Sequence, residues 1–172
     1  MRTKYVIVLP YDPDWKDEFI KIESELLQVL GDTALAVEHV GSTSVDGLAA
    51  KPIIDIDVVV EGDDVQKAID KLATIGYIHE GNLGIEGREA FAYEGKEHLM
   101  THHLYVCPKG SRELKRHLAF RDYLRSHNEA VLAYGNAKIE AAKLYPYDIE
   151  KYIDYKSPII EKIYKEIEEQ CE

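Results

Sequence analysis

The chain reads HVGSTS at residues 39–44 and KPIIDIDVVV at residues 51–60. The second stretch is rich in β-branched residues, which predicts a strand. Because side chains alternate along a strand, Asp55 and Asp57 would share one face, while Ile54, Ile56 and Val58 face a core. Two nearby carboxylates repel each other, and half-buried carboxylates are costly unless a cation joins them. The pattern therefore predicts a divalent metal ion bound by Asp55 and Asp57.

The HVGSTS stretch predicts a turn that can hold phosphate oxygens. The backbone N–H groups of Gly41 and Ser42, together with the Ser42 hydroxyl, suit such a cradle. The alternative is a plain strand-to-helix turn in which Ser42 caps the helix. Lys51 stands before Pro52, which favours an extended backbone. Lys51 is then either a phosphate contact or a surface lysine.

Length, charge and cysteine content bound the class of protein. The 172 residues predict a single domain over residues 1–172. A formal net charge of −11 argues against a protein that wraps long nucleic acid, although a local cationic pocket could still bind a small anion. The two cysteines are far apart in the sequence, so a disulfide scaffold is not expected. Free cysteines suit a reducing compartment, so a cytoplasmic location is expected. No apolar run is long enough to cross a membrane, so no membrane partner is expected.

Periodicity and turn residues predict the order of the elements. We expect strands at 5–9, 34–39, 53–60, 77–80 and 101–107, hairpins and loops over 81–96, and helices at 14–30, 65–76, 111–127 and 130–144. A last helix is expected to carry Ile153, Ile160, Ile163 and Ile167. Asp14 looks like the N-cap of the first helix. This order predicts an α+β domain in which a mixed β-sheet is followed by a helical C-terminal region.

A second polar position falls on the strand expected at 101–107. If Leu104 and Val106 face the core, His103 faces the opposite side of the sheet. His103 would then join Asp55 and Asp57 when the two strands are neighbours. The alternative is a structural histidine that is hydrogen-bonded across the sheet.

These residues resemble the GrpB family, a group of small proteins placed in the nucleotidyltransferase superfamily. The resemblance covers nearly the whole chain. It is carried by PYDPDW (10–15), EHVGSTSV (38–45), GLAAKPIIDI (47–56), HHLYV (102–106), FRDYLR (120–125) and YIDYK (152–156). The resemblance implies a compact nucleotidyltransferase-like fold, with helices packed around a mixed sheet.

The resemblance also implies a chemistry. In that superfamily a Gly-Ser turn holds the phosphates of a nucleoside triphosphate, and two strand carboxylates hold Mg²⁺. A third carboxylate on a neighbouring strand helps to activate the attacking hydroxyl. Carried over to this chain, Asp55 and Asp57 would hold the metal. The residues expected to bind nucleotide phosphates are Gly41, Ser42, Thr43, Lys51, Arg88, Arg121 and Lys156. The default alternative for Arg88, Arg121 and Lys156 is a solvated or ion-paired cation.

This chain departs from the superfamily pattern at the third carboxylate, where the expected strand offers His103. Imidazole favours Mn²⁺, Ni²⁺ or Zn²⁺ over Mg²⁺, so His103 is either a third metal ligand or a general base. The expected cofactor is therefore a divalent metal, Mg²⁺ or Mn²⁺ or another transition metal.

The expected function is that of a metal-dependent nucleotidyltransferase-like enzyme that acts on a nucleotide and a small-molecule acceptor, with Asp55, Asp57 and His103 as catalytic residues. One alternative, motivated by the missing third carboxylate, is a catalytically inactive nucleotide- or metabolite-binding module. Relatives of the family occur fused to dephospho-coenzyme A kinase, which would link such a module to coenzyme A metabolism. Another alternative is a metal-dependent phosphohydrolase.

Overall fold

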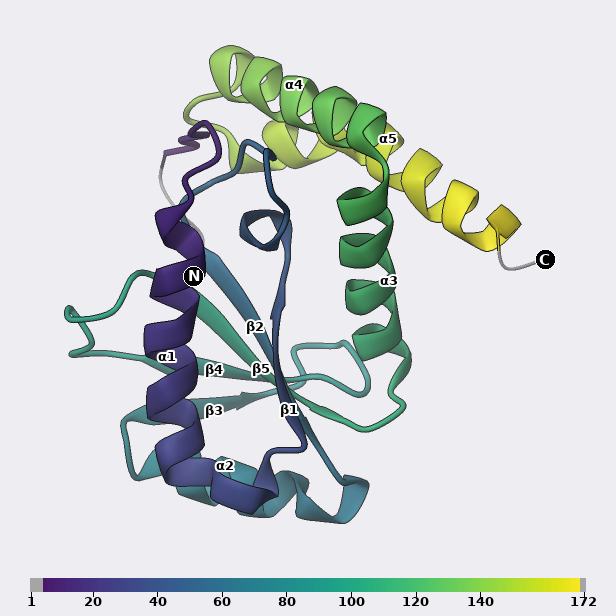
Figure 1. Ribbon diagram of the computed structural model, residues 1–172. Coiled ribbons are helices and arrows are strands. Elements are labelled where there is room, and N and C mark those ends of the chain that lie inside the picture. The colour runs from purple at the N-terminus through teal and green to yellow at the C-terminus, as the bar shows by residue number, and fades with distance from the viewer. Residues whose placement is uncertain (1–4, 171–172) are drawn as a thin grey trace.

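A five-stranded mixed sheet forms the centre of the protein in the computed structural model, which describes residues 5–170 (Figure 1). The strands are β1 (Ala36–Val40), β2 (Ile54–Val60), β3 (Tyr77–Gly81), β4 (Glu89–Tyr93) and β5 (His102–Pro108). Their order is β1-β2-β5-β4-β3, with β2 and β5 parallel and the other neighbours antiparallel. The predicted mixed sheet is confirmed.

Helices cover both faces of the sheet (Figure 1). The helices are α1 (Asp14–Leu30), α2 (Val65–Ala73), α3 (Arg112–Ser126), α4 (Asn128–Leu144) and α5 (Ile149–Gln170), with short 3-10 turns at Gly31–Thr33, Ser42–Ser44 and Gly62–Asp64. The last three helices follow the sheet without another strand, as the α+β prediction requires.

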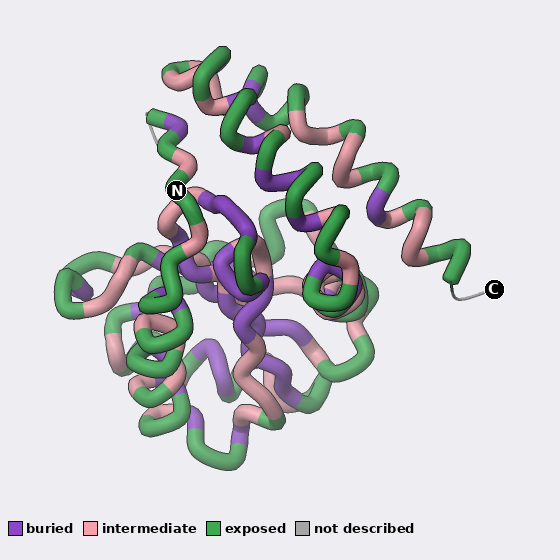
Figure 2. The backbone as a smooth tube through the Cα atoms, turned by 45° about the horizontal axis from the view of Figure 1, so that its top comes forward, coloured by how far each residue is buried: buried purple, intermediate pink, exposed green. Residues whose placement is uncertain are grey.

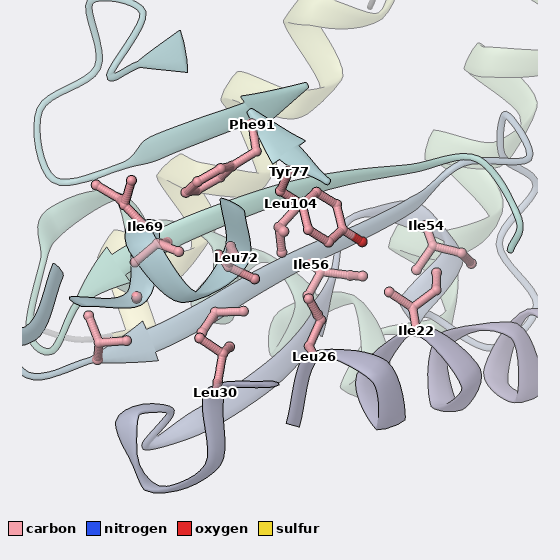
Figure 3. Packing of buried hydrophobic residues seen from close by; sticks show 14 of the residues in the cluster. Ile22, Leu26, Leu30, Ile54, Ile56, Ile69, Leu72, Tyr77, Phe91 and Leu104 are labelled. Atoms are coloured by element: carbon pink, nitrogen blue, oxygen red, sulfur yellow. The ribbon is translucent and has the colours of Figure 1, made fainter. Parts of the chain in front are cut away.

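The main core lies between the sheet and the α1–α2 pair. Ile22 and Leu26 of α1 and Leu72 of α2 pack against Ile56 and Leu104 of the central strands (Figure 3). The helical residues recur at intervals of three to four, so one face of each helix is apolar. Each side chain of this size contributes about 1.5–3 kcal/mol when it is fully buried. This packing fixes which face of β2 and β5 is left for polar residues.

The three C-terminal helices have a second core that includes the loop after β1. Val45 and Leu48 of that loop are buried with Leu124, Val131 and Ile163 of α3, α4 and α5. Figure 2 shows buried positions concentrated at the sheet, while the outer turns of α4 and α5 are largely exposed or intermediate. The loop after β1 is therefore held between the sheet and the C-terminal helices.

Two predictions about the N-terminal part are wrong. Residues 5–9 do not form a strand, since Leu9 makes only an isolated bridge with Ala50. Pro10 has no N–H with which to continue the ladder. Pro13, and not Asp14, occupies the N-cap of α1, and the Asp12 carboxylate accepts the Asp14 N–H at 2.9 Å.

Other boundaries shift by a few residues at most. The strand expected at 34–39 is β1, Ala36–Val40, and the loop segment of 81–96 contains β4. No helix within residues 5–170 has the length and apolar character needed to cross a membrane.

Candidate functional site

Asp55, Asp57 and His103 lie on one face of the sheet. In the parallel pairing of β2 with β5, Asp55 is opposite His103 and Asp57 is opposite Tyr105. Their neighbours Ile56 and Leu104 belong to the main core, so these four side chains face away from α1 and α2. The predicted juxtaposition of the three residues on adjacent strands is confirmed.

His103 contacts Asp55 directly. The distance from His103 Nδ1 to Asp55 Oδ1 is 3.0 Å, and both side chains are about one-third exposed. A carboxylate only accepts hydrogen bonds, so Nδ1 is the donor. In the neutral ring this leaves Nε2 without a proton, available as a base or as a metal ligand.

Gly41 lies against the Asp55 carboxylate. Its φ is +73°, and a Cβ built on it would lie 2.2 Å from Asp55 Oδ2. Only glycine accepts both this conformation and this approach. The Gly-Ser turn and the carboxylate are therefore parts of one site, as β1 and β2 pair Val40 with Asp55.

The buried Thr43 side chain anchors the turn by hydrogen bonds. Its hydroxyl donates to the Ile53 carbonyl at 3.2 Å and lies 2.9 Å from His39 Nε2, and the residue is buried. The Ser44 hydroxyl donates to the Gly41 carbonyl. A phosphate contact from Thr43 would have to come from its backbone, whereas Gly41 and Ser42 line a cavity.

Asp57 is fully buried and bonded to a histidine that sequence reasoning missed. His117 Nδ1 donates to Asp57 Oδ2 at 2.6 Å, and His117 Nε2 donates to Glu113 Oε1 at 3.1 Å. Burial lowers the pKa of His117, but the bonds to Asp57 and Glu113 outweigh it, so the pKa is raised. Burial raises the pKa of Asp57, against the opposing effect of His117. The one sequence signal was the four-residue spacing of Glu113 and His117, which does not reveal that α3 lies over β2.

The donor atoms suit a metal that is shared with a phosphate ligand. Asp57 Oδ1 is buried and has no hydrogen-bond partner among residues 5–170. In that same part of the chain, no group of three or more His, Cys, Asp or Glu side chains is arranged to hold an ion on its own. Mg²⁺ is commonly held by one or two carboxylates together with substrate phosphates, so Asp55 and Asp57 fit that mode better than a closed protein cage.

Two cavities meet at Asp55. The first, of about 220 Å³, is named here the aromatic cavity and is lined by Gly41, Asp55, Arg88, Tyr105, His117, Phe120 and Tyr164, with Val40. The second, of about 250 Å³, is named the lysine pocket and is lined by Lys51, Lys138 and Lys156 with Gly41, Ser42, Asp55, His103, Phe120, Tyr134 and Tyr152, among others. A single extended ligand could therefore occupy both cavities and pass over Asp55.

Of the three lysines that line the lysine pocket, Lys51 and Lys156 were predicted and Lys138 was missed. Lys51 and Lys156 lie 5.6 and 4.8 Å from the Tyr152 ring, and Lys138 lies 4.4 Å from the Tyr134 ring. Burial and the repulsion of Lys51 lower the pKa of Lys156 to about 8. On α4, Lys138 falls among the apolar residues of the helix, a position that indicated core packing and gave no signal of a site.

The two predicted arginines have different surroundings. Arg88 lines the aromatic cavity with its guanidinium 4.3 Å from the Tyr105 ring. Arg121 is already engaged, since its Nη1 donates to Glu38 Oε2 at 2.7 Å and to the His39 carbonyl at 3.2 Å. Its Nε donates to Asp122 Oδ1 at 2.9 Å, so a phosphate contact from Arg121 would have to come from Nη2.

Comparison with known proteins identifies the family. The family model described as "GrpB protein" matches residues 5–166. The chain belongs to the GrpB family. The crystal structure of GrpB from Enterococcus faecalis superposes with a TM-score of 0.83 at 39% identity, covering 96% of this chain and 100% of that one.

Curated relatives include longer proteins. YqkA of Bacillus subtilis (strain 168) is 35% identical over 156 residues, which are 90% of this chain but 45% of YqkA. A dephospho-CoA kinase of Mycobacterium tuberculosis (strain ATCC 25618 / H37Rv) is 40% identical over 74 residues, which are 41% of this chain and 18% of the kinase. This GrpB chain therefore spans less than half of the length of some of its relatives.

More distant structures identify the fold. Cid1 in complex with the UTP analogue UMPNPP superposes with a TM-score of 0.53 at 11% identity, covering 78% of this chain and 42% of Cid1. The GrpB chain thus has the nucleotidyltransferase-like fold that the sequence predicted.

Proposed function

We propose that this GrpB protein is a metal-dependent nucleotidyltransferase-like protein that acts on a nucleotide and a small acceptor. The observation that carries the proposal is the convergence of Asp55 and Asp57, the Gly41-Ser42 turn and the lysine pocket on one face of the sheet. Carboxylates for a metal, backbone N–H groups and lysines for phosphates are the parts that nucleotidyl transfer needs. The fold shared with Cid1, which was crystallised with a UTP analogue, agrees with this chemistry.

Each cavity suits a different part of a nucleotide. The lysine pocket offers cations and the Ser42 hydroxyl, which suit phosphate oxygens. The aromatic cavity offers the rings of Tyr105, Phe120 and Tyr164, which suit a nucleobase or sugar. Asp55 and Asp57 would hold a divalent metal ion, which neutralises charge on the phosphates when bound.

His103 would act on the acceptor. In the transfer, the acceptor hydroxyl oxygen bonds to the α-phosphorus, the bond from that phosphorus to the next bridging oxygen breaks, and pyrophosphate leaves with the electron pair. The hydroxyl proton would go to His103 Nε2, because Nδ1 already donates to Asp55. The alternative role of His103, as a third metal ligand beside Asp55 and Asp57, is not favoured, because no three such side chains among residues 5–170 are arranged to hold an ion.

Calorimetry tests the proposal. Asp55→Asn and Asp57→Asn each remove one negative oxygen donor, so metal-dependent binding of a nucleoside triphosphate should weaken by at least about tenfold. Asp63→Asn changes an exposed carboxylate away from the site and is the matched control. Circular dichroism checks that each variant is folded. Nucleotide binding that is equally tight in the folded Asp55 and Asp57 variants would refute the assignment.

The second candidate is a catalytically inactive binding module. A link of such a module to coenzyme A metabolism would agree with the 74-residue similarity to dephospho-CoA kinase. It is favoured by His103, which occupies the strand where the superfamily pattern calls for a third carboxylate. Incubation with labelled nucleoside triphosphates, Mg²⁺ or Mn²⁺ and a metabolite extract separates the two candidates. Pyrophosphate release that is lost in Asp55→Asn supports the enzyme, and nucleotide binding without any release supports the module.

A further inference from the structure

Lys138 is an unusual residue for the centre of a helix bundle. It lies on α4 with an exposed fraction of 2%, and its Nζ has no hydrogen-bond partner among the described residues 5–170. Burying an amine without a partner costs free energy in either protonation state, and more when it is charged. A methionine of similar length would fill the same space without this cost, so packing alone does not explain the lysine.

The surroundings of Lys138 point to an anion. Lys51 and Lys156 line the same pocket, together with the Gly41-Ser42 turn and the hydroxyl of Tyr152, which is buried and unpartnered within the described part of the chain. The lining includes one carboxylate, Asp55, against three lysines. In a protein with a net charge of −11, this is a local excess of cationic groups.

Without a ligand, the pocket disfavours the charged form of its lysines. Burial and the neighbouring Lys156 and Lys51 lower the pKa of Lys138 well below its ordinary value, and Asp55 only partly opposes this. The pKa of Lys156 falls to about 8 for the same reasons. The other titratable side chains that face the pocket are His103, Tyr134 and Tyr152. Burial holds both tyrosines neutral by raising the pKa of Tyr134 to about 12 and that of Tyr152 further. An anion placed among the lysines would restore their charge.

We propose that the lysine pocket binds a compact anion of two or more linked phosphate groups, and that binding is accompanied by proton uptake onto Lys138 and Lys156. The phosphates can belong to a nucleoside triphosphate or to free inorganic polyphosphate, and the inference rests on the proposed function only for the first source. Three charged lysines and the Asp55 carboxylate leave a net charge of +2 in the pocket, so an anion with at least two negative charges is needed to balance it.

Titration calorimetry with inorganic tripolyphosphate tests the anion site. The purified full chain is freed of metal with EDTA, dialysed, and titrated near pH 8.5 in buffers of different ionisation enthalpy. We expect binding whose heat depends on the buffer, corresponding to uptake of about one proton or more. Heats that are the same in every buffer, or no binding, would overturn the inference.

Substitutions locate the effect. Lys138→Met should weaken tripolyphosphate binding by about tenfold or more and reduce the proton uptake, because a charge-assisted hydrogen bond is lost. Lys143→Met, at an exposed position of the same helix, is the matched control and should bind as the wild type does. Lys138→Met should also raise the midpoint of unfolding, and this measurement checks that the variant is folded. Lys156→Gln is a second variant in the pocket. Wild-type affinity and proton uptake in both pocket variants would contradict the proposal.

The Asp55→Asn variant distinguishes this inference from the proposed function. Without metal, it should bind tripolyphosphate more tightly than the wild type, because the one carboxylate of the pocket is neutralised. With metal, it should bind nucleotide more weakly. UTP should compete with tripolyphosphate and UMP should not. If tripolyphosphate binds with proton uptake but UTP does not compete, the anion site stands and the nucleotide assignment fails.

Discussion

At the scale of single residues, the approach of Gly41 to Asp55 links the Gly41-Ser42 turn to the strand carboxylates. The sequence predicted both parts of this pair, because a Gly-Ser turn and a strand with alternating aspartates are local patterns. The sequence could not predict how closely Gly41 approaches Asp55, where a Cβ built on Gly41 would lie only 2.2 Å from Asp55 Oδ2. That distance depends on the pairing of β1 with β2, which is a long-range contact.

Gly41→Ala tests this contact. The added methyl group would overlap Asp55, and the φ of +73° disfavours any side chain, so we expect a loss of about 1–3 kcal/mol in the free energy of unfolding. Displacement of Asp55 should also weaken metal-dependent nucleotide binding. Gly110→Ala is a matched control, since Gly110 has φ +81° but no atom within 4 Å of the built Cβ. Urea unfolding and calorimetry measure the two effects, and equal losses in both variants would show that the contact is unimportant.

At the scale of elements, α3 holds the Gly41-Ser42 turn against the sheet. Arg121 donates to Glu38 and to the His39 carbonyl of β1, and Arg125 donates to the Ser44 carbonyl at 2.9 and 3.1 Å. The Ser111 hydroxyl caps this helix by accepting the Leu114 N–H at 3.2 Å. The sequence predicted the helix within one residue at each end, because capping and periodicity are local. Its docking on β1 and β2 was not predictable, and for that reason His117 was missed.

Arg121→Met tests whether α3 positions the turn. Loss of the two hydrogen bonds should lower the free energy of unfolding by about 1–2 kcal/mol. It should also weaken nucleotide binding by displacing the turn, without any direct contact between Arg121 and the ligand. Lys115→Met, at an exposed position of α3, is the control. Denaturant unfolding and calorimetry provide the readouts. Full stability with weakened binding would instead favour a direct phosphate contact by Arg121, as the sequence resemblance implied.

At the scale of the whole molecule, buried titratable groups make stability depend on pH. Burial lowers the pKa of His39 to about 4, against 6.5 for the unfolded chain. Between those values the unfolded state binds the proton and the folded state does not, so acid favours unfolding. His39 should therefore contribute a loss of stability that begins as the pH falls below about 6.5 and continues towards pH 4, by about 3 kcal/mol at most.

Urea unfolding between pH 4.5 and 7.5 measures this dependence. The pKa values of Asp57 and His117 are also raised in the folded protein, so these residues add their own pH dependence, and the informative quantity is the difference between the wild type and His39→Gln. The variant should lose the component of the pH dependence that comes from residue 39, even though it is less stable because the Thr43 contact and the ring stacking on Phe19 are changed. Parallel pH profiles for the two proteins would show that His39 is not responsible.

The molecule as a whole brings together residues that are far apart in the sequence. The patterns around Asp55, His103 and the Gly-Ser turn were readable because each lies on a strand or at its end. Lys138, Tyr134 and Tyr152 were not readable as a site, because apolar and aromatic neighbours on a helix are usual in a core. Only the packing of α4 and α5 beside the turn brings Lys138 and Lys156 into one pocket with Lys51.

The central claim is that a nucleotide and a metal share the face of the sheet that carries Asp55 and Asp57. A crystal structure with a non-hydrolysable nucleoside triphosphate analogue and Mn²⁺ tests it most directly, because anomalous scattering locates the manganese. We expect a manganese peak bound by Asp55 and Asp57, with the terminal phosphates beside Ser42 and Lys138. A manganese peak away from both aspartates, or a nucleotide bound outside the aromatic cavity and the lysine pocket, would contradict it.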